Sequence, residues 1–190
     1  MPTDTRSEIK PLPGFRSTEA ASFLAQLDDQ LALLHKNTRG LSSEDLAWQP
    51  APGMNTIGML LAHLAVVEVW WTKIALHDET DADVLDVIGI GVDDDGLPLP
   101  ESAPPYALLN GKDLAFYDDL LAKARAFVTS VAKEATPEDL DRVITRTRPD
   151  GSKRVLNVRW YFYHVLEHFA GHYGQILLLR HLRRVSLVRS

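Results

Sequence analysis

Hydrophobic residues recur at intervals of three or four in four separate segments of this 190-residue chain. The first segment begins at Ser17 or Thr18, which suit a helix N-cap, and ends near Gly40. The other segments run from about 55 to 77, 112 to 133 and 157 to 183. Because this spacing places side chains on one face of an α-helix, it predicts four long amphipathic helices that pack against one another.

The connection between the second and third predicted helices is long and acidic. Residues 78–111 are rich in Asp, Pro and Gly, and they contain nine acidic residues but no Lys or Arg. A connection of this length inside a compact domain is usually functional, or it crosses from one end of a bundle to the other. We expect a single domain over residues 1–190, with 78–111 as an acidic loop insertion.

A short β-hairpin is predicted before the fourth helix. Asp150-Gly151 is a typical hairpin turn, and β-forming residues flank it at 143–145 and at Val155. Asn157 then suits the N-cap of the fourth helix. These elements together predict an all-α fold, a four-helix bundle with one small hairpin.

The absence of cysteine limits the chemistry that this chain can perform by itself. It excludes disulfides, thiolate zinc sites, iron–sulfur clusters and a cysteine nucleophile. A metal ion would have to be bound by His, Asp, Glu or backbone oxygen.

The charge distribution bears on the partners of the protein. A formal net charge of −6 argues against nucleic acid, because phosphate contacts need a clustered basic surface. Residues 142–159 contain six basic residues and one acidic residue. We interpret this segment as a solvated surface, with the binding of an anionic ligand as the alternative.

Two segments bear on targeting and membrane insertion. Residues 1–16 lack the apolar run of a signal peptide. The longest apolar stretch, Gly58 to Trp71, is interrupted by His63 and Glu68, and it is predicted to be too short and too polar to span a bilayer. We therefore expect a cytoplasmic protein without a membrane partner.

Three histidines, His164, His168 and His172, lie four residues apart in the fourth predicted helix, on a face that also carries apolar residues. A neutral imidazole buried there needs partners for its ring nitrogens, because each unpaired group costs about 1–3 kcal/mol. One divalent cation can bind two imidazoles at this spacing. The alternative is a pair of hydrogen-bonded core histidines.

His63 in the second predicted helix is the candidate third ligand. A facing helix can bring it opposite His168 and His172, and three imidazoles leave a coordination position open, as in catalytic sites. Taken alone, a histidine such as His63 is more often a core or boundary residue than a metal ligand. Gly171 and Gly174 beside His172 predict the close approach of another backbone or of a ligand, or tight helix packing, because glycine lowers helix propensity.

The chain resembles the DinB/YfiT-like superfamily of metalloenzymes from about Gly14 to Leu182. One motif is Trp48-Gln49-Pro50 followed by the segment 55–64, NTIGMLLAHL, which contains His63. The other motif is the segment 164–176, HVLEHFAGHYGQI. The hairpin before the fourth helix also fits the family.

The resemblance implies an up-down-down-up four-helix bundle with one divalent metal bound by His63, His168 and His172. Zinc and nickel are the metals associated with the family, and homodimers are common. Members with known activity resemble S-transferases that use bacillithiol, mycothiol or glutathione, and a mycothiol-dependent maleylpyruvate isomerase is related. The 78–111 connection is longer than in the family, and we expect it to cover the site or to shape a substrate pocket.

These observations lead to the hypothesis of a metal-dependent thiol S-transferase, in which a small-molecule thiol attacks an electrophilic substrate. Because the thiol brings the sulfur, the protein needs no cysteine. The candidates for orienting ligands or bonding the second ring nitrogens are Tyr163, His164, Glu167, Tyr173 and Gln175. The candidates for binding a carboxylate of the thiol are Arg146, Arg148, Arg154 and Arg159. The alternatives are a metal-dependent hydrolase and a non-catalytic, metal-stabilised stress-response or interaction protein.

Overall fold

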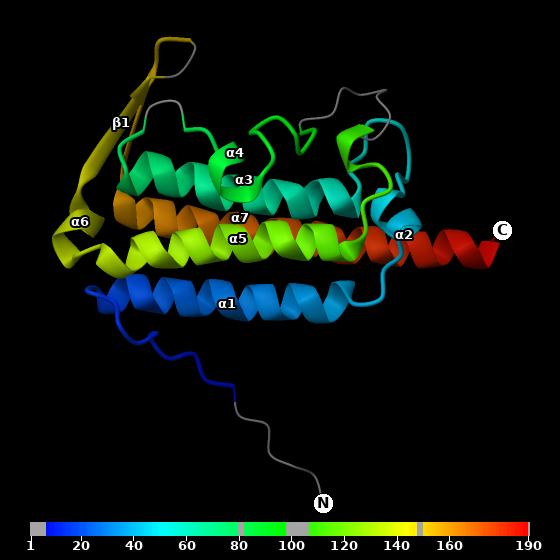
Figure 1. The fold of residues 1–190 in the computed structure, drawn as a ribbon, viewed down its shortest axis with the longest axis horizontal. Coiled ribbons are helices and arrows are strands. Elements are labelled where there is room, and N and C mark those ends of the chain that lie inside the picture. The colour runs from blue at the N-terminus through cyan, green and yellow to red at the C-terminus, as the bar shows by residue number, and fades with distance from the viewer. Residues whose placement is uncertain (1–6, 80–81, 98–106, 148–149, 190) are drawn as a thin grey trace, which may run out of the picture.

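Four long helices lie side by side and form most of the protein (Figure 1). This computed structural model describes residues 7–79, 82–97, 107–147 and 150–189. The long helices are α1 (Thr18–Thr38), α3 (Ile57–Leu76), α5 (Leu114–Glu134) and α7 (Val158–Arg189). The short elements are α2 (Ser43–Ala47), α4 (Leu85–Ile88), α6 (Pro137–Asp141), the 3₁₀ helix η1 (Ala107–Leu109) and the strands β1 (Val143–Thr147) and β2 (Lys153–Asn157). The predicted helical fold with a small antiparallel sheet is confirmed.

Polar side chains cap the starts of the long helices. The hydroxyl oxygens of Ser17 and Thr56 accept hydrogen bonds from backbone N–H groups in the first turns of α1 and α3. Asn157 Oδ1 accepts from the N–H of Trp160 at 2.9 Å, at the start of α7. Each bond satisfies a donor that has no partner inside the helix. The first residue of α5 is Leu114 because Asp113 is its N-cap, two residues later than we expected.

The direction of the chain differs between pairs of helices. In Figure 1, α1 and α7 run from left to right, whereas α3 and α5 run from right to left. The connection from α3 to α5 therefore crosses the length of the helices, and it contains α4 and η1. Helix α3 packs against both α5 and α7, and α1 also contacts these two helices.

Helix α3 is buried on nearly every side, unlike the one-faced helix that its spacing predicted. Sixteen of its 20 residues are buried, because α5, α7, α2 and α4 surround it. By length and composition alone the whole helix, Ile57–Leu76, could cross a membrane, although the stretch Gly58 to Trp71 within it was expected to be too short and too polar. Inside the described structure, 78% of its apolar window is buried against protein, as in the core helix of a folded domain.

A buried ion-pair network contains the acidic residue that interrupts the apolar run of α3. The side chain of Glu68 is 3% exposed, and its two carboxylate oxygens accept from Arg125 Nε at 3.1 Å and Nη2 at 2.7 Å. Arg125 Nη1 also donates to Asp28 Oδ1 at 2.6 Å. Three long helices are thereby linked, and Glu68 takes no part in the histidine cluster.

The predicted hairpin is present at the end of the molecule where α3 finishes and α7 begins (Figure 1). Strand β1 pairs antiparallel with β2, and Arg146 stands opposite Arg154. The carboxylate of Asp150 accepts from the backbone N–H of Ser152, which stabilises the turn. Arg148 lies outside the described residues.

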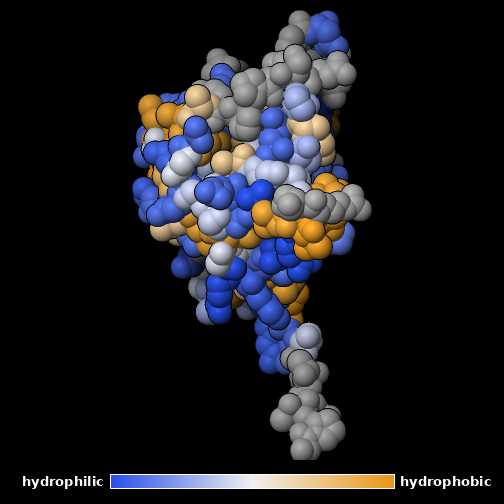
Figure 2. All heavy atoms as spheres, turned by 90° about the vertical axis from the view of Figure 1, so that its right-hand side faces the viewer, coloured by the Kyte–Doolittle hydropathy of each residue, from blue (hydrophilic) through white to orange (hydrophobic). Residues whose placement is uncertain are grey.

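Several apolar side chains of α7 remain on the surface. Leu178 and Leu187 are more than half exposed, and Val188 is 87% exposed. Figure 2 views the end of the molecule at which α7 finishes and shows separate hydrophobic areas among hydrophilic ones. A side chain at Gly171 or Gly174 would meet nothing within 4 Å. Tight packing within this chain, one of the two interpretations of these glycines, is therefore wrong.

Candidate metal centre

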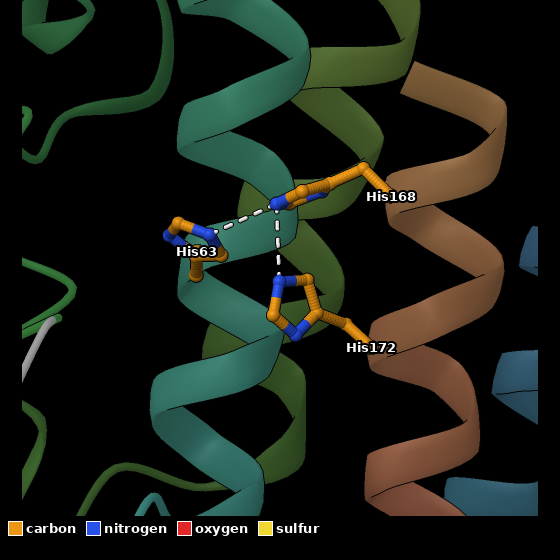
Figure 3. A group of neighbouring side chains, drawn as sticks. All are labelled: His63, His168 and His172. Carbon is orange, nitrogen blue, oxygen red and sulfur yellow. Dashed lines mark hydrogen bonds between the residues drawn. The ribbon is translucent and has the colours of Figure 1, made fainter. Parts of the chain in front are cut away.

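His63 of α3 and two histidines of α7 point toward one another between the helices (Figure 3). The Nε2 atom of His168 lies 3.1 Å from Nε2 of His63 and 3.0 Å from Nε2 of His172. One nitrogen from each of the three rings lies within 4.8 Å of the other two. Three imidazoles from two neighbouring helices thus share one small volume.

The helix geometry explains this convergence. His168 and His172 are one turn apart on α7, so their rings lie on the same face, with centroids 4.3 Å apart. All three side chains, that of His63 on α3 and those of His168 and His172 on α7, are half-buried. This position keeps the rings within reach of a small molecule at the surface.

Asp95 forms a hydrogen bond with His63, and this contact was not predicted from the sequence. Its carboxylate Oδ2 lies 2.7 Å from Nδ1 of His63, and its side chain is only 3% exposed. The other oxygen, Oδ1, accepts from the backbone N–H of Leu97 at 2.9 Å. Because an ionised carboxylate can only accept, Nδ1 of His63 donates, and the lone pair of His63 is left on Nε2. The acidic connection thereby contacts the histidine cluster.

Gln175 likewise forms a hydrogen bond with His172. Its side-chain oxygen lies 2.9 Å from Nδ1 of His172, so Nδ1 donates to it and Nε2 again carries the lone pair. At most one proton, on Nε2 of His168, is then left for the contacts with His63 and His172. One proton serves two nitrogen–nitrogen contacts, and a cation that accepts three lone pairs satisfies all three rings.

Burial favours the neutral, metal-binding form of His168 and His172. Burial, together with the neighbouring His172, His63 and His164, lowers the pKa of His168 to about 3. Burial also lowers the pKa of His172, although Gln175 opposes the shift. A neutral imidazole offers a lone pair at neutral pH, so competition from protons is weak.

The spacing of the nitrogens fits a divalent ion. Zinc–nitrogen bonds of about 2.0–2.1 Å in tetrahedral geometry place two ligand nitrogens roughly 3.3 Å apart. The separations of 3.1 Å and 3.0 Å come close to this value. Carboxylate and amide partners on the second ring nitrogens are also typical of imidazoles that bind metals. The residues present are therefore compatible with a divalent metal.

The other predicted site residues differ in their distance from the cluster. The ring of His164 lies 5.9 Å from that of His168 and stacks on Trp160 at 4.5 Å. Glu167 lies 3.9 Å from His164 Nδ1. The Tyr173 hydroxyl accepts from Asn37 of α1 instead, at 2.6 Å, and the Tyr163 side chain is largely exposed.

The predicted arginines fall into two groups. Arg159 donates to Glu19 with Nε at 2.6 Å and with Nη2 at 3.1 Å, and it also pairs with Asp141, so it links α7 to α1 and α6. The guanidinium groups of Arg146 and Arg154 lie over tryptophan rings at the hairpin end of the cluster. Of the predicted arginines that the structure describes, Arg154 is thus the one that lies over Trp160, the ring that stacks on His164.

A pocket of about 260 Å³ lies on the opposite side of the cluster. Its lining is mostly apolar and consists of Gly53, Met54, Asn55, Leu60, Gln175, Leu178 and Leu179. Gln175 belongs both to this pocket and to the contact with His172. An apolar group in the pocket would therefore lie beside Gln175, the hydrogen-bond partner of His172.

The fold and the site define a mostly helical protein with a three-histidine cluster compatible with a divalent metal. The family model of the mycothiol S-transferases matches residues 22–184, and the chain belongs to this DinB-like family. Among solved structures, a conserved protein from Enterococcus faecalis has a TM-score of 0.62 and 16% identity, over 84% of this chain and 94% of that chain. This likeness shows the fold alone. No curated protein matches the chain.

Proposed function

We propose that this protein is a metal-dependent S-transferase that joins a small-molecule thiol to an electrophilic substrate. The observation that carries the proposal is the convergence of the His63, His168 and His172 Nε2 atoms in a member of the mycothiol S-transferase family. Three protein ligands leave a further coordination position for the sulfur. Because the chain has no cysteine, the nucleophilic sulfur has to come from the thiol substrate.

The metal ligands, their hydrogen-bond partners and the apolar pocket would each have a separate role in the reaction. A divalent ion bound by the three imidazoles would favour the deprotonated form of a coordinated thiol. Asp95 and Gln175 fix the two rings that they contact, so that both Nε2 atoms stay aimed at one point. The apolar pocket beside Gln175 would hold the electrophile. In a substitution, the sulfur–carbon bond forms as the leaving group departs with its electron pair, and the thiol proton passes to solvent. In an addition to an activated double bond, the sulfur bonds to one carbon and the neighbouring carbon takes up a proton.

Several further features belong to the same proposal. The metal is zinc or nickel, and the thiol is of the mycothiol or bacillithiol type. The four long helices form an up-down-down-up bundle in one domain, with 78–111 as an insertion that brings Asp95 to the cluster. The protein acts in the cytoplasm as a homodimer, and the exposed apolar side chains of α7 support a contact between subunits.

The proposal is tested by metal content and by thiol consumption. The purified protein is loaded with zinc or with nickel, and the bound metal is counted for the wild type, His168→Ala and His164→Ala. We expect His168→Ala to lose the metal and His164→Ala to keep it, because only the His168 ring directs a nitrogen at the other two ligands. Unchanged metal content in His168→Ala would contradict the site.

The reaction is then followed with a panel of small thiols and a chromogenic electrophile. We expect the metal-loaded wild type to accelerate thiol consumption over buffer, and His168→Ala to lose the acceleration. Acceleration with no thiol would argue against a transferase. Turnover of esters or amides without a thiol would instead identify the same open site as that of a hydrolase, through an activated water.

A further inference from the structure

Two arginines stand directly opposite each other on the hairpin next to the histidine cluster. Arg146 of β1 pairs with Arg154 of β2, and both side chains are half-buried. Like charges at opposed positions of an antiparallel pair repel each other. A favourable contact must therefore compensate for this repulsion, and the neighbouring helices supply it.

Tryptophan rings hold both guanidinium groups. The Cζ atom of Arg154 lies 4.2 Å from the centroid of Trp160, and that of Arg146 lies 4.5 Å from Trp70. Both groups also contact Trp71, at 5.9 Å for Arg154 and 5.5 Å for Arg146. A guanidinium over an aromatic ring is stabilised by the ring electrons. The two arginines are thus fixed in place over one aromatic surface.

The position of the Arg154 guanidinium over the Trp160 ring is compatible with free N–H donors at its edge. Stacking uses the flat face of a guanidinium, whereas its N–H groups lie around the edge. Within the described part of the chain, Arg154 has no hydrogen bond or ion pair to a carboxylate. Arg159, by contrast, donates hydrogen bonds to the carboxylates of Glu19 and Asp141. The ionisable groups near the Arg154 surface are His164 and Glu167, together with Arg146.

A continuous row of rings connects this surface to the histidine cluster. Trp160 stacks on His164 with an angle of 17° between the rings, and His164 in turn contacts His168. Trp160 and His168 are eight residues apart on α7, which corresponds to about 12 Å along the helix axis. A small molecule with one end at the three histidines can therefore reach Arg154 with the other end.

We propose that Arg154, supported by Trp160 and Arg146, binds a carboxylate of the small molecule whose other end reacts at the three histidines. The inference rests on the proposed function and adds the chemical class and the approximate length of a substrate. A carboxylate accepts two parallel hydrogen bonds from the edge of a guanidinium, which suits the free donors of Arg154. The carboxylate belongs either to the thiol or to the electrophile.

The test measures binding rather than turnover. Calorimetry on the zinc-loaded full-length protein compares ω-mercapto-carboxylates of increasing chain length with ω-mercapto-alcohols of the same lengths. A second series compares unreactive N-alkylsuccinimides that end in a carboxylate or in an alcohol, as analogues of an electrophile. We expect one of the two series to show an advantage of about tenfold for the carboxylate, at lengths that span about 12 Å.

Variants show whether Arg154 is the residue that causes the higher affinity for the carboxylate compounds. Arg154→Gln should abolish it, Arg154→Lys should retain part of it, and Lys153→Gln should leave it unchanged. Lys153 is the matched control, because it is the neighbouring exposed cation on β2. The series that shows the advantage identifies the thiol or the electrophile as the carrier of the carboxylate. Equal affinities in both series, or an advantage that persists in Arg154→Gln, would overturn the inference.

The same samples separate this inference from the proposed function. Thiol consumption with N-alkylmaleimides is measured in parallel. A carboxylate advantage that depends on Arg154, without any turnover, supports the anion site and contradicts the transferase. Turnover with equal affinity for carboxylate and alcohol compounds supports the transferase and overturns the anion site.

Discussion

Asp95 accepts a hydrogen bond from Nδ1 of His63 at 2.7 Å, and this contact ties the acidic connection to helix α3. The two residues are 32 positions apart in the chain. The bond fixes the orientation of the imidazole and directs Nε2 toward His168. Because Asp95 is almost fully buried, water cannot easily take the place of His63 as the hydrogen-bond partner of its carboxylate.

Replacement of Asp95 should weaken metal binding. We expect Asp95→Ala to lower the affinity for zinc about 10- to 100-fold, the usual effect of losing a partner of a metal-bound histidine. Asp95→Asn should lower it less, since the amide oxygen can still accept from Nδ1. Competition with a chromogenic chelator measures the affinity. Asp93→Ala, an exposed neighbour in the same connection, is the control, and equal losses in Asp93→Ala and Asp95→Ala would contradict the role of Asp95.

The stability of the metal-free protein should depend on pH through His168. Its pKa is about 3 in the folded protein, chiefly because of burial, against an ordinary value of 6.5. Between these values the unfolded chain binds a proton that the folded protein does not, so the free energy of unfolding should fall as the pH falls from about 6.5 toward 3.

Denaturant titrations of chelator-treated protein measure this dependence. The fall should be smaller in His168→Asn than in the wild type, because the variant lacks the group that titrates. His181→Asn, at an exposed position of α7, should follow the wild type. Parallel curves for the wild type and His168→Asn would show that His168 does not contribute.

The Glu68–Arg125 pair should be costly to break. Arg125→Met would leave the buried Glu68 carboxylate without its two hydrogen bonds, and we expect a loss of about 3–5 kcal/mol in the free energy of unfolding. The double variant Glu68→Leu/Arg125→Met should be more stable than Arg125→Met alone, because no unpaired charge remains. Lys123→Met breaks an exposed pair with Asp119 and should cost less than about 1 kcal/mol. Chemical denaturation checks all three, and a small effect of Arg125→Met would contradict the argument.

Two glycine substitutions should have opposite effects. A Cβ atom at Gly58 would lie 2.8 Å from Tyr117 Cζ and 3.2 Å from the Leu46 carbonyl oxygen, so Gly58→Ala should destabilise the protein by about 1–3 kcal/mol. A Cβ atom at Gly171 would meet no neighbour, so Gly171→Ala should raise stability by up to about 1 kcal/mol through helix propensity. Thermal unfolding of both variants checks the contrast. If Gly171→Ala is destabilised and also disrupts the proposed homodimer, this helix face would instead belong to a subunit contact.

The long helices and the hairpin could be predicted from the amino-acid sequence. Intervals of three and four located the four long helices, and Asp150-Gly151 located the hairpin, because both patterns depend on neighbouring residues. The spacing of His168 and His172 likewise placed both rings on one face of one helix. The helix ends were less accurate: α7 continues to Arg189, six residues beyond Arg183, because no glycine or proline ends it earlier.

The sequence by itself therefore determined the helices, the hairpin and the pair of histidines on α7, since the periods of helix and turn are local. The carboxylate that orients His63 could not be derived in this way. Asp95 is one of nine acidic residues in its segment, and only the path of the connection buries it against His63. The position of Arg154 over Trp160, and the ion pairs that occupy Arg159, likewise depend on how distant elements pack. Such contacts follow from the three-dimensional arrangement of the chain, which a local pattern does not encode.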